Sequence, residues 1–216
     1  MKTDAQIKTD VLDELNWDPQ IDHSQIGVIV KDGAVTLTGH VPTYLQRNVA
    51  KMAAQRVSGV HAIVNEIEVE LPSEHRMSDE GLAERVAHVL RWNVSTSGRD
   101  IRAEVKGGVV TLRGKLDRNF QRANILRNLE HVSGVKAIVD HMTIEPQVSI
   151  REVQEEIKAA LNRHAEFGAS NIDITTSGGT VILEGTVESL DEMDRIKQAA
   201  WAAPGVHNVV DNLRVV

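Results

Sequence analysis

The chain has no cysteine among its 216 residues, which excludes disulfide bridges and thiolate metal sites as sources of stability. Aromatic residues make up only 3% of the chain, so its hydrophobic cores must consist mainly of aliphatic side chains. No apolar run approaches the roughly 20 residues that a membrane-spanning helix requires. Small units held together by aliphatic packing are therefore expected.

The first ten residues, MKTDAQIKTD, are mostly polar and charged. They are not followed by the apolar core of about 7 to 15 residues that is typical of a secretory signal peptide. We therefore expect the chain as written to remain in the cytoplasm, and to be periplasmic only if it is a processed form.

A glycine pattern occurs three times in the chain, with shifts of 75 and then 71 residues. Within each copy the gaps between the glycines are 6 and 20 residues. Self-similarity of this kind indicates tandem copies of one fold, and we predict modules at residues 1–72, 73–146 and 147–216. The structural glycines are Gly33, Gly39 and Gly59; Gly108, Gly114 and Gly134; and Gly179, Gly185 and Gly205.

Each module begins with a pattern typical of an amphipathic helix. Apolar residues at positions i, i+4 and i+8 lie on one helix face, and Thr3, Ser78 or Ser149 precedes them as the N-cap. The three apolar stripes are Ile7, Val11 and Leu15; Leu82, Val86 and Leu90; and Val153, Ile157 and Leu161.

Two alternating apolar runs follow in each module and predict a β-hairpin. Their two-residue connections supply the positive φ angles that a primed turn needs. A second amphipathic helix comes next and ends at a glycine, which suits the C′ position. A last strand follows, and we expect a β-bulge where a polar residue interrupts its alternation. The predicted turns are Asp32–Gly33, Gly107–Gly108 and Gly178–Gly179, and the predicted bulges are at Asn65, Asp140 and Asp211.

The predicted order within a module is helix, strand, strand, helix, strand. The hairpin must be antiparallel, whereas the return through the second helix is expected to be a right-handed crossover to a parallel strand. The fold class is therefore α+β, with three tandem two-layer α/β sandwich modules that each contain a mixed three-stranded sheet. Units of about 65 residues are marginally stable alone, so the modules are expected to pack on one another.

The repeated segments resemble the BON domain, a bacterial family named after an osmotically inducible protein and nodulation proteins. The resemblance rests on DGAVTLTG at residues 32–39 and on the GVHAIVN segment at residues 59–65, with counterparts in the other two modules. It implies attachment to phospholipid or other envelope surfaces, in a stress-response or transport-associated setting. One family member binds potassium. The family supplies no catalytic motif.

The sequence shows no pattern typical of catalysis or of metal binding. Nine histidines are present, but none has H-x-H or H-E-x-x-H spacing. The paired glycines lie between two strands and not between a strand and a helix, which excludes a dinucleotide-binding loop. We predict no catalytic residues, no metal site and no cofactor. Trp17 and Trp92, at the ends of two first helices, are expected to pack against the cores.

Charge distinguishes the middle module from the other two. Residues 1–72 have 6 basic and 10 acidic side chains, residues 73–146 have 12 and 10, and residues 147–216 have 6 and 11. The net charges are therefore −4, +2 and −5. Counting outward from the hairpin turns makes Arg102 and Arg113 cross-strand neighbours, and likewise Asp173 and Glu184. Like charges in such positions are unfavourable unless an opposite charge meets them.

We therefore predict that the basic face of module 2 meets either the acidic face of module 3 or an anionic partner. Nucleic acid is not expected as a partner, because the chain has a net charge of −7. The leading hypothesis is a non-enzymatic binding or scaffolding protein that recognises phospholipid, another membrane surface or a protein. The alternative is a sensor of a small ligand or a cation such as potassium, held by backbone carbonyls at a module junction. The candidate anion-binding or lipid-binding residues are Arg102, Arg113, Lys115, Arg118 and Arg122.

Overall fold

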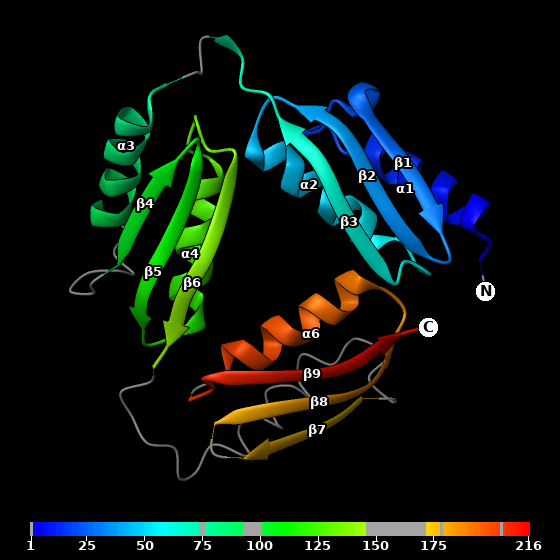
Figure 1. Ribbon diagram of the computed structural model, residues 1–216. Coiled ribbons are helices and arrows are strands. Elements are labelled where there is room, and N and C mark those ends of the chain that lie inside the picture. The colour runs from blue at the N-terminus through cyan, green and yellow to red at the C-terminus, as the bar shows by residue number, and fades with distance from the viewer. Residues whose placement is uncertain (1, 74–76, 93–100, 146–171, 178, 204) are drawn as a thin grey trace.

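A computed structural model describes residues 2–73, 77–92, 101–145, 172–177, 179–203 and 205–216. Figure 1 shows three units in chain order, each with its own sheet. The predicted first helix of module 3, the Ser149 N-cap and Gly178 lie outside the described residues.

Module 1 has the predicted order of elements. Helix α1 (Asp4–Trp17) leads through a 3-10 turn (His23–Gln25) to strands β1 (Ile26–Lys31) and β2 (Ala34–Val41). Helix α2 (Tyr44–Arg56) and strand β3 (Ala62–Val69) complete the unit. Thr3 caps α1 through a capping box with Gln6.

Modules 2 and 3 repeat this arrangement. Module 2 contains α3 (Asp79–Trp92), β4 (Arg102–Lys106), β5 (Val109–Leu116), α4 (Asn119–Glu130) and β6 (Ala137–Ile144). The described part of module 3 contains β7 (Ile172–Ser177), β8 (Thr180–Val187), α6 (Leu190–Ala202) and β9 (Asn208–Val215).

Each module forms a mixed three-stranded sheet, which confirms the predicted α+β fold class. The strand orders are β1-β2-β3, β4-β5-β6 and β7-β8-β9. In each sheet the hairpin pair is antiparallel and the last strand is parallel to the middle strand. The register pairs Arg102 with Arg113 and Asp173 with Glu184, as counting from the turns predicts.

The helices cover one face of each sheet and bury an aliphatic core there. Leu37, Leu112 and Leu183 occupy the same repeat position on the middle strands and are fully buried. Three separate clusters of buried residues correspond to the three modules. Because the helices of a module lie on one side of its sheet, the other face of the sheet is exposed to solvent.

The described hairpin turns require positive φ angles. Asp32 and Gly33 have φ values of 50° and 72°, and Gly107 and Gly108 have values of 60° and 81°, as a type I′ turn requires. Gly39 has a φ of 112°, and an added Cβ there would lie 1.9 Å from the Gln25 carbonyl oxygen. All nine repeated glycines have positive φ.

The predicted β-bulges are wrong. Strands β2 and β3 pair residue by residue across Asn65, and the register is equally continuous at the two counterparts. Asn65 Oδ1 instead accepts a hydrogen bond from the N–H of Ile67, while the Arg47 guanidinium donates to the carbonyl oxygens of Asn65 and Ile67. The polar side chain therefore faces the helix layer without breaking the alternation.

Contacts between modules run through the second helices. Helix α6 packs against both α2 and α4, and Figure 1 shows the three helices directed toward the middle of the molecule. Asn48 Nδ2 on α2 donates to Glu130 Oε1 on α4 at 3.0 Å, and Gln55 Nε2 donates to Asp194 Oδ2 on α6 at 2.8 Å. Tyr44 packs on the core of module 2, and Leu190 packs on the core of module 1.

Candidate functional site

Three chain segments lead to the end of module 2 opposite the Gly107–Gly108 turn. Asp79 at the start of α3 accepts hydrogen bonds from both turn N–H groups, so the helix runs away from the turn. Strand β5 also runs away from the turn, and α4 begins just beyond its last residue, Leu116. A helix of 14 residues and a strand of 8 residues span similar distances, roughly 21 and 26 Å. The end of α3, the end of β5 and the start of α4 are therefore all directed away from the turn (Figure 1).

We name this region the distal end of module 2 and define it by Arg91, Trp92, Lys115, Arg118 and Phe120. All five residues are exposed. The side chains of Trp92 and Phe120 are 75% and 54% exposed. Two exposed apolar rings and three exposed cations therefore lie in the segments at this end of the module.

The prediction that the two helix-end tryptophans pack on the cores is wrong. Trp17 is 84% exposed and Trp92 is 75% exposed. The buried face of α1 ends at Leu15, and Trp17 lies two residues further on, which turns its side chain away from that face. The third tryptophan, Trp201, does pack on the core of module 3.

The five predicted basic residues lie in three different places. Arg102 and Arg113 lie on the exposed sheet face, directly opposite one another. Lys115 and Arg118 lie at the distal end, where Lys115 forms an ion pair with Glu145 at 2.8 Å. Both partners of that pair are largely exposed, so its contribution to stability is small.

Arg122 lies on neither of these two surfaces. It lies on α4, and its Nε donates to Asp140, a strand residue that faces the helix layer. Asp140 Oδ1 also accepts from the N–H of Met142, which repeats the arrangement at Asn65. The charge of Arg122 is therefore neutralised within the module.

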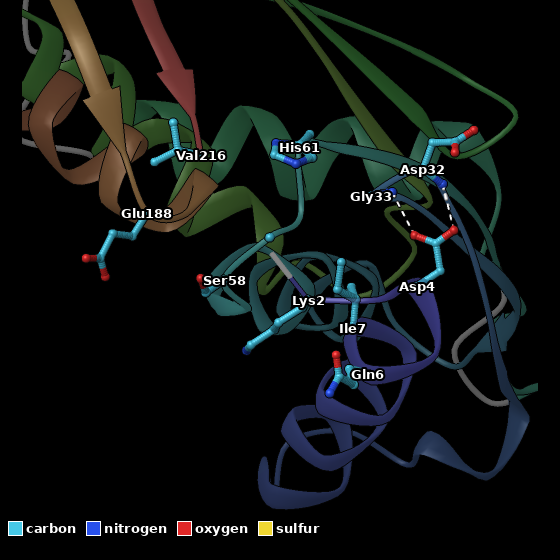
Figure 2. Close-up of a pocket in the computed structure, with 11 residues that line it drawn as sticks. Lys2, Asp4, Gln6, Ile7, Asp32, Gly33, Ser58, His61, Glu188 and Val216 are labelled. Carbon is cyan, nitrogen blue, oxygen red and sulfur yellow. Dashed lines mark hydrogen bonds between the residues drawn. The ribbon is translucent and has the colours of Figure 1, made fainter.

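Two cavities lie where the last strand of one module approaches the hairpin turn of another. The first, of about 900 Å³, lies between module 1 residues such as Lys2, Gly33 and His61 and module 3 residues Glu188 and Val216. Figure 2 shows Asp4 in this cavity accepting hydrogen bonds from the N–H groups of the turn, at 2.8 and 3.0 Å. Its carboxylate is thus already used to hold the turn.

The second cavity, of about 600 Å³, occupies the corresponding position in module 2. It is lined by Asp79, Gly108 and Lys136 and by the end of β3 from module 1, including Glu70. The two cavities are both open and contain residues of mixed charge. They share a position in the repeat and the equivalent aspartates Asp4 and Asp79, each of which already binds its hairpin turn.

One titratable group lies at the contact between modules 1 and 2. Partial burial raises the pKa of Glu130 above its ordinary value, although the hydrogen bond from Asn48 and the nearby His131 and Arg127 act to lower it. The carboxylate is therefore less stable in this contact than it is in water.

Across the described ranges, no three histidine, aspartate or glutamate side chains converge on a point where a metal ion could be held. None of the helices in those ranges combines the length and the hydrophobicity needed to cross a bilayer.

The sequence interpretation missed the aromatic part of the distal end. A signal was available, because Trp17 and Trp92 are two of only three tryptophans and occur at the same repeat position. It also missed Asp4 and Asp79, which follow the N-cap in two modules and bind the hairpin turns. Module 3 has Ile150 at that position, outside the described residues.

Comparison with known proteins finds relatives for most of the chain. Osmotically-inducible protein Y of Escherichia coli (strain K12) is 27% identical over 146 residues, which cover 64% of this chain and 73% of that protein. An uncharacterized protein in the gshII 5′ region of Anaplasma centrale is 29% identical over 122 residues, covering 53% of this chain and 81% of that protein.

Similar solved structures have low overall agreement. The C-terminal domain of CdsD, a structural protein of the type III secretion system of Chlamydia trachomatis, aligns over all of both chains with a TM-score of 0.27 and 15% identity. The PrgH periplasmic domain aligns over 95% of this chain and 99% of that domain with a TM-score of 0.22 and 10% identity.

The family model for the BON domain matches residues 3–70, 78–146 and 149–216, one match in each module. These matches agree with the repeated α-β-β-α-β order and with the distant relation to osmotically-inducible protein Y. The chain therefore belongs to the BON domain family, of which it contains three tandem copies.

Proposed function

We propose that the chain is a non-enzymatic scaffold that attaches to anionic phospholipid surfaces through the distal end of module 2. The observation that carries this proposal is the exposure of Trp92 and Phe120 at the end of the module where three cations are also exposed. Tryptophan is favoured at the boundary between lipid headgroups and acyl chains, because its ring is apolar and its N–H is polar. The distal end thus has both parts of an interfacial anchor.

The charges at this end favour an anionic surface over a neutral one. Each basic residue near such a surface contributes about 1 kcal/mol, so Arg91 and Arg118 together contribute roughly 2 kcal/mol at low salt, whereas the charge of Lys115 is offset by Glu145. The acidic excess of the chain lies in modules 1 and 3, and the Debye length of about 8 Å at physiological salt screens much of its repulsion.

The setting of this attachment is proposed from the relatives. One relative is named for its induction by osmotic stress. We propose a corresponding stress-response or transport-associated role, in which three modules on one chain hold partners at a membrane surface. Attachment through a single module leaves the other two modules accessible.

The test is co-sedimentation with vesicles of phosphatidylglycerol and, separately, of phosphatidylcholine. The wild-type chain is expected to sediment with the anionic vesicles and not with the neutral ones. Trp92→Ala is expected to weaken binding about tenfold or more, since it removes most of the apolar contact. Arg118→Glu is expected to weaken it about 30-fold, through the loss of one attraction and the gain of one repulsion.

Trp17→Ala is the matched control, because Trp17 has the same repeat position and exposure but no basic neighbours at the corresponding positions. It is expected to bind as the wild type does. Equal binding by the Trp92 and Trp17 variants, or no binding of the wild-type chain to anionic vesicles, would refute the proposal.

A second candidate function is a cation sensor, and the two corresponding junction cavities favour it. Backbone carbonyls at the hairpin turns would be the ligands of a large cation such as potassium. Thermal unfolding in potassium chloride is then expected to occur at a higher temperature than in sodium chloride at equal ionic strength. Equal melting temperatures in the two salts would remove this candidate.

A further inference from the structure

The exposed sheet faces of modules 2 and 3 have rows of opposite charge at the same repeat positions. In module 2 the row consists of Arg102, Arg113 and His141, one from each strand. In module 3 the corresponding row consists of Asp173, Glu184 and Asn212. Because the two modules share one fold, the two rows have the same spacing.

Module 1 provides an internal comparison. Its corresponding row consists of Gly27, Thr38 and Glu66, with no like-charged pair across the hairpin. The paired charges are therefore not needed for the fold itself. They occur only where two modules can provide charges of opposite sign.

Each charged row lies beside a row that is partly apolar. Val139 in module 2 and Val210 in module 3 occupy the same repeat position and are 38% and 36% exposed. In module 3 the neighbouring residue across the sheet is Ile182. The adjacent row of module 2 also contains Glu104, so the complementarity of the two faces rests on the Arg102–Arg113 and Asp173–Glu184 pairs.

The two faces cannot meet within one chain. Modules 2 and 3 contact each other through α4 and α6, which cover the opposite, inner faces of the two sheets. The charged rows therefore point away from this contact. An anionic membrane would suit the module 2 row but would repel the module 3 row, whereas a second copy of the chain suits both.

We propose that the exposed face of module 2 binds the exposed face of module 3 of a second copy of the chain. The contact joins two different surfaces, so a pair of copies retains one unused module 2 face and one unused module 3 face. Association of this type extends head to tail into chains or closes into rings, and it weakens as salt screens the charges. The inference concerns the sheet faces and does not depend on lipid binding at the distal end.

Charge reversal provides a sharp test, because the reversed chains are expected to fold. Arg113→Glu places an acid opposite Arg102, and Glu184→Arg places a base opposite Asp173, so both changes replace a like-charged pair by an opposite pair. Sedimentation velocity over a concentration series at low salt measures the association. The wild-type chain is expected to show a sedimentation coefficient that rises with concentration.

Each reversed chain alone is expected to associate at least about tenfold more weakly, since its altered face has one charge of each sign and no longer complements the unchanged face. An equimolar mixture of the two reversed chains is expected to regain association, because their faces are again complementary. Thr38→Glu changes the corresponding position of module 1 and is the matched control, expected to associate as the wild type does.

Three outcomes would overturn the proposal. The first is a wild-type chain that remains monomeric over the whole concentration series. The second is a mixture of reversed chains that associates no better than either chain alone. The third is an Arg113→Glu chain that associates normally but no longer binds phosphatidylglycerol vesicles, which would assign the face to the membrane instead.

Discussion

Modules 1 and 2 both have a tryptophan at the last position of their first helix. The residues near this tryptophan in the sequence and at the end of the middle strand differ between the two modules. Trp17 follows Asn16, and the nearby end of β2 contains His40. Trp92 follows Arg91, and the end of β5 contains Lys115. The interiors of the two modules are alike, so the exposed positions are the ones that differ in a way that can determine binding.

The start of the second helix also differs between modules 1 and 2, with a cation and an exposed ring in module 2. In module 1 the N-cap is Thr43, and Leu45 packs on the core. In module 2 the N-cap position is Arg118, and Phe120 is exposed. These positions therefore contribute to the cap and the core in module 1, whereas in module 2 they are exposed.

The largest expected effect tests whether the interiors are equivalent. Leu37→Ala and Leu112→Ala each remove a fully buried side chain at the same repeat position, and each is expected to lower the free energy of unfolding by about 2–5 kcal/mol. Chemical denaturation measures both. If one substitution is tolerated within about 1 kcal/mol, the two cores are not equivalent.

A second prediction compares two glycines that both have positive φ. Gly39→Ala is expected to destabilise module 1 by about 3 kcal/mol or more, because its Cβ meets a backbone carbonyl that cannot move away. Gly107→Ala is expected to cost only about 1 kcal/mol, since no atom lies within 4 Å of the added Cβ. Thermal unfolding of both variants separates the effect of the clash from the cost of the positive φ angle. Equal losses of stability in the two variants would show that the close approach at Gly39 is absent.

A third prediction transfers binding from module 2 to module 1. In a chain with Trp92→Ala, the substitutions Asn16→Arg and His40→Lys place two cations beside Trp17 at exposed positions. They are expected to restore about 2 kcal/mol of affinity for phosphatidylglycerol vesicles, or roughly 30-fold. Glutamine at positions 16 and 40 is the neutral control. If glutamine also restores binding to the vesicles, charge is not the cause.

The smallest expected effect concerns Glu130 at the contact between modules 1 and 2. Its folded-state pKa is raised, so the folded chain holds the proton more firmly than the unfolded chain does. The stability from this group is therefore present at low pH and is lost as the pH rises from the ordinary carboxyl pKa through the folded-state value. Glu130→Gln is expected to remove this loss and to be more stable at neutral pH by up to about 1 kcal/mol.

Denaturation curves at several pH values measure the effect of Glu130→Gln. Glu84→Gln, at an exposed position on α3, is the control and is expected to leave the pH profile unchanged. A variant at position 130 that is less stable than the wild type at neutral pH would contradict this description of the contact.

Much of the fold is predictable from local spacing. Short-range geometry determines the apolar stripe from Ile7 to Leu15 and the Asp32–Gly33 turn. The same patterns recur after a shift of 75 residues, so one copy predicts the next. The predicted bulge at Asn65 failed because a polar residue in a strand can also face inward when nearby backbone and side-chain groups satisfy it.

The candidate site was less predictable, for a physical reason. Whether Trp92 is buried depends on the direction of its side chain beyond the last core turn of α3, which residue type does not determine. Arg122 and Arg118 are both arginines in or near the start of α4, so the sequence does not distinguish them. Only Arg122 is neutralised, by Asp140, which lies 18 residues further along the chain. The packing of α6 on α2 and α4 involves side chains from three modules and has no local signature.

The most direct test of the account is tryptophan fluorescence in chains that retain a single tryptophan. One chain retains Trp92 and has phenylalanine at positions 17 and 201, and the matched chain retains Trp17. On addition of phosphatidylglycerol vesicles, the emission of the Trp92 chain is expected to shift to shorter wavelength as the ring enters the headgroup region, whereas the Trp17 chain is expected not to shift. An equal shift in both chains, or a shift in the Trp17 chain alone, would contradict the assignment of the binding surface to the distal end of module 2.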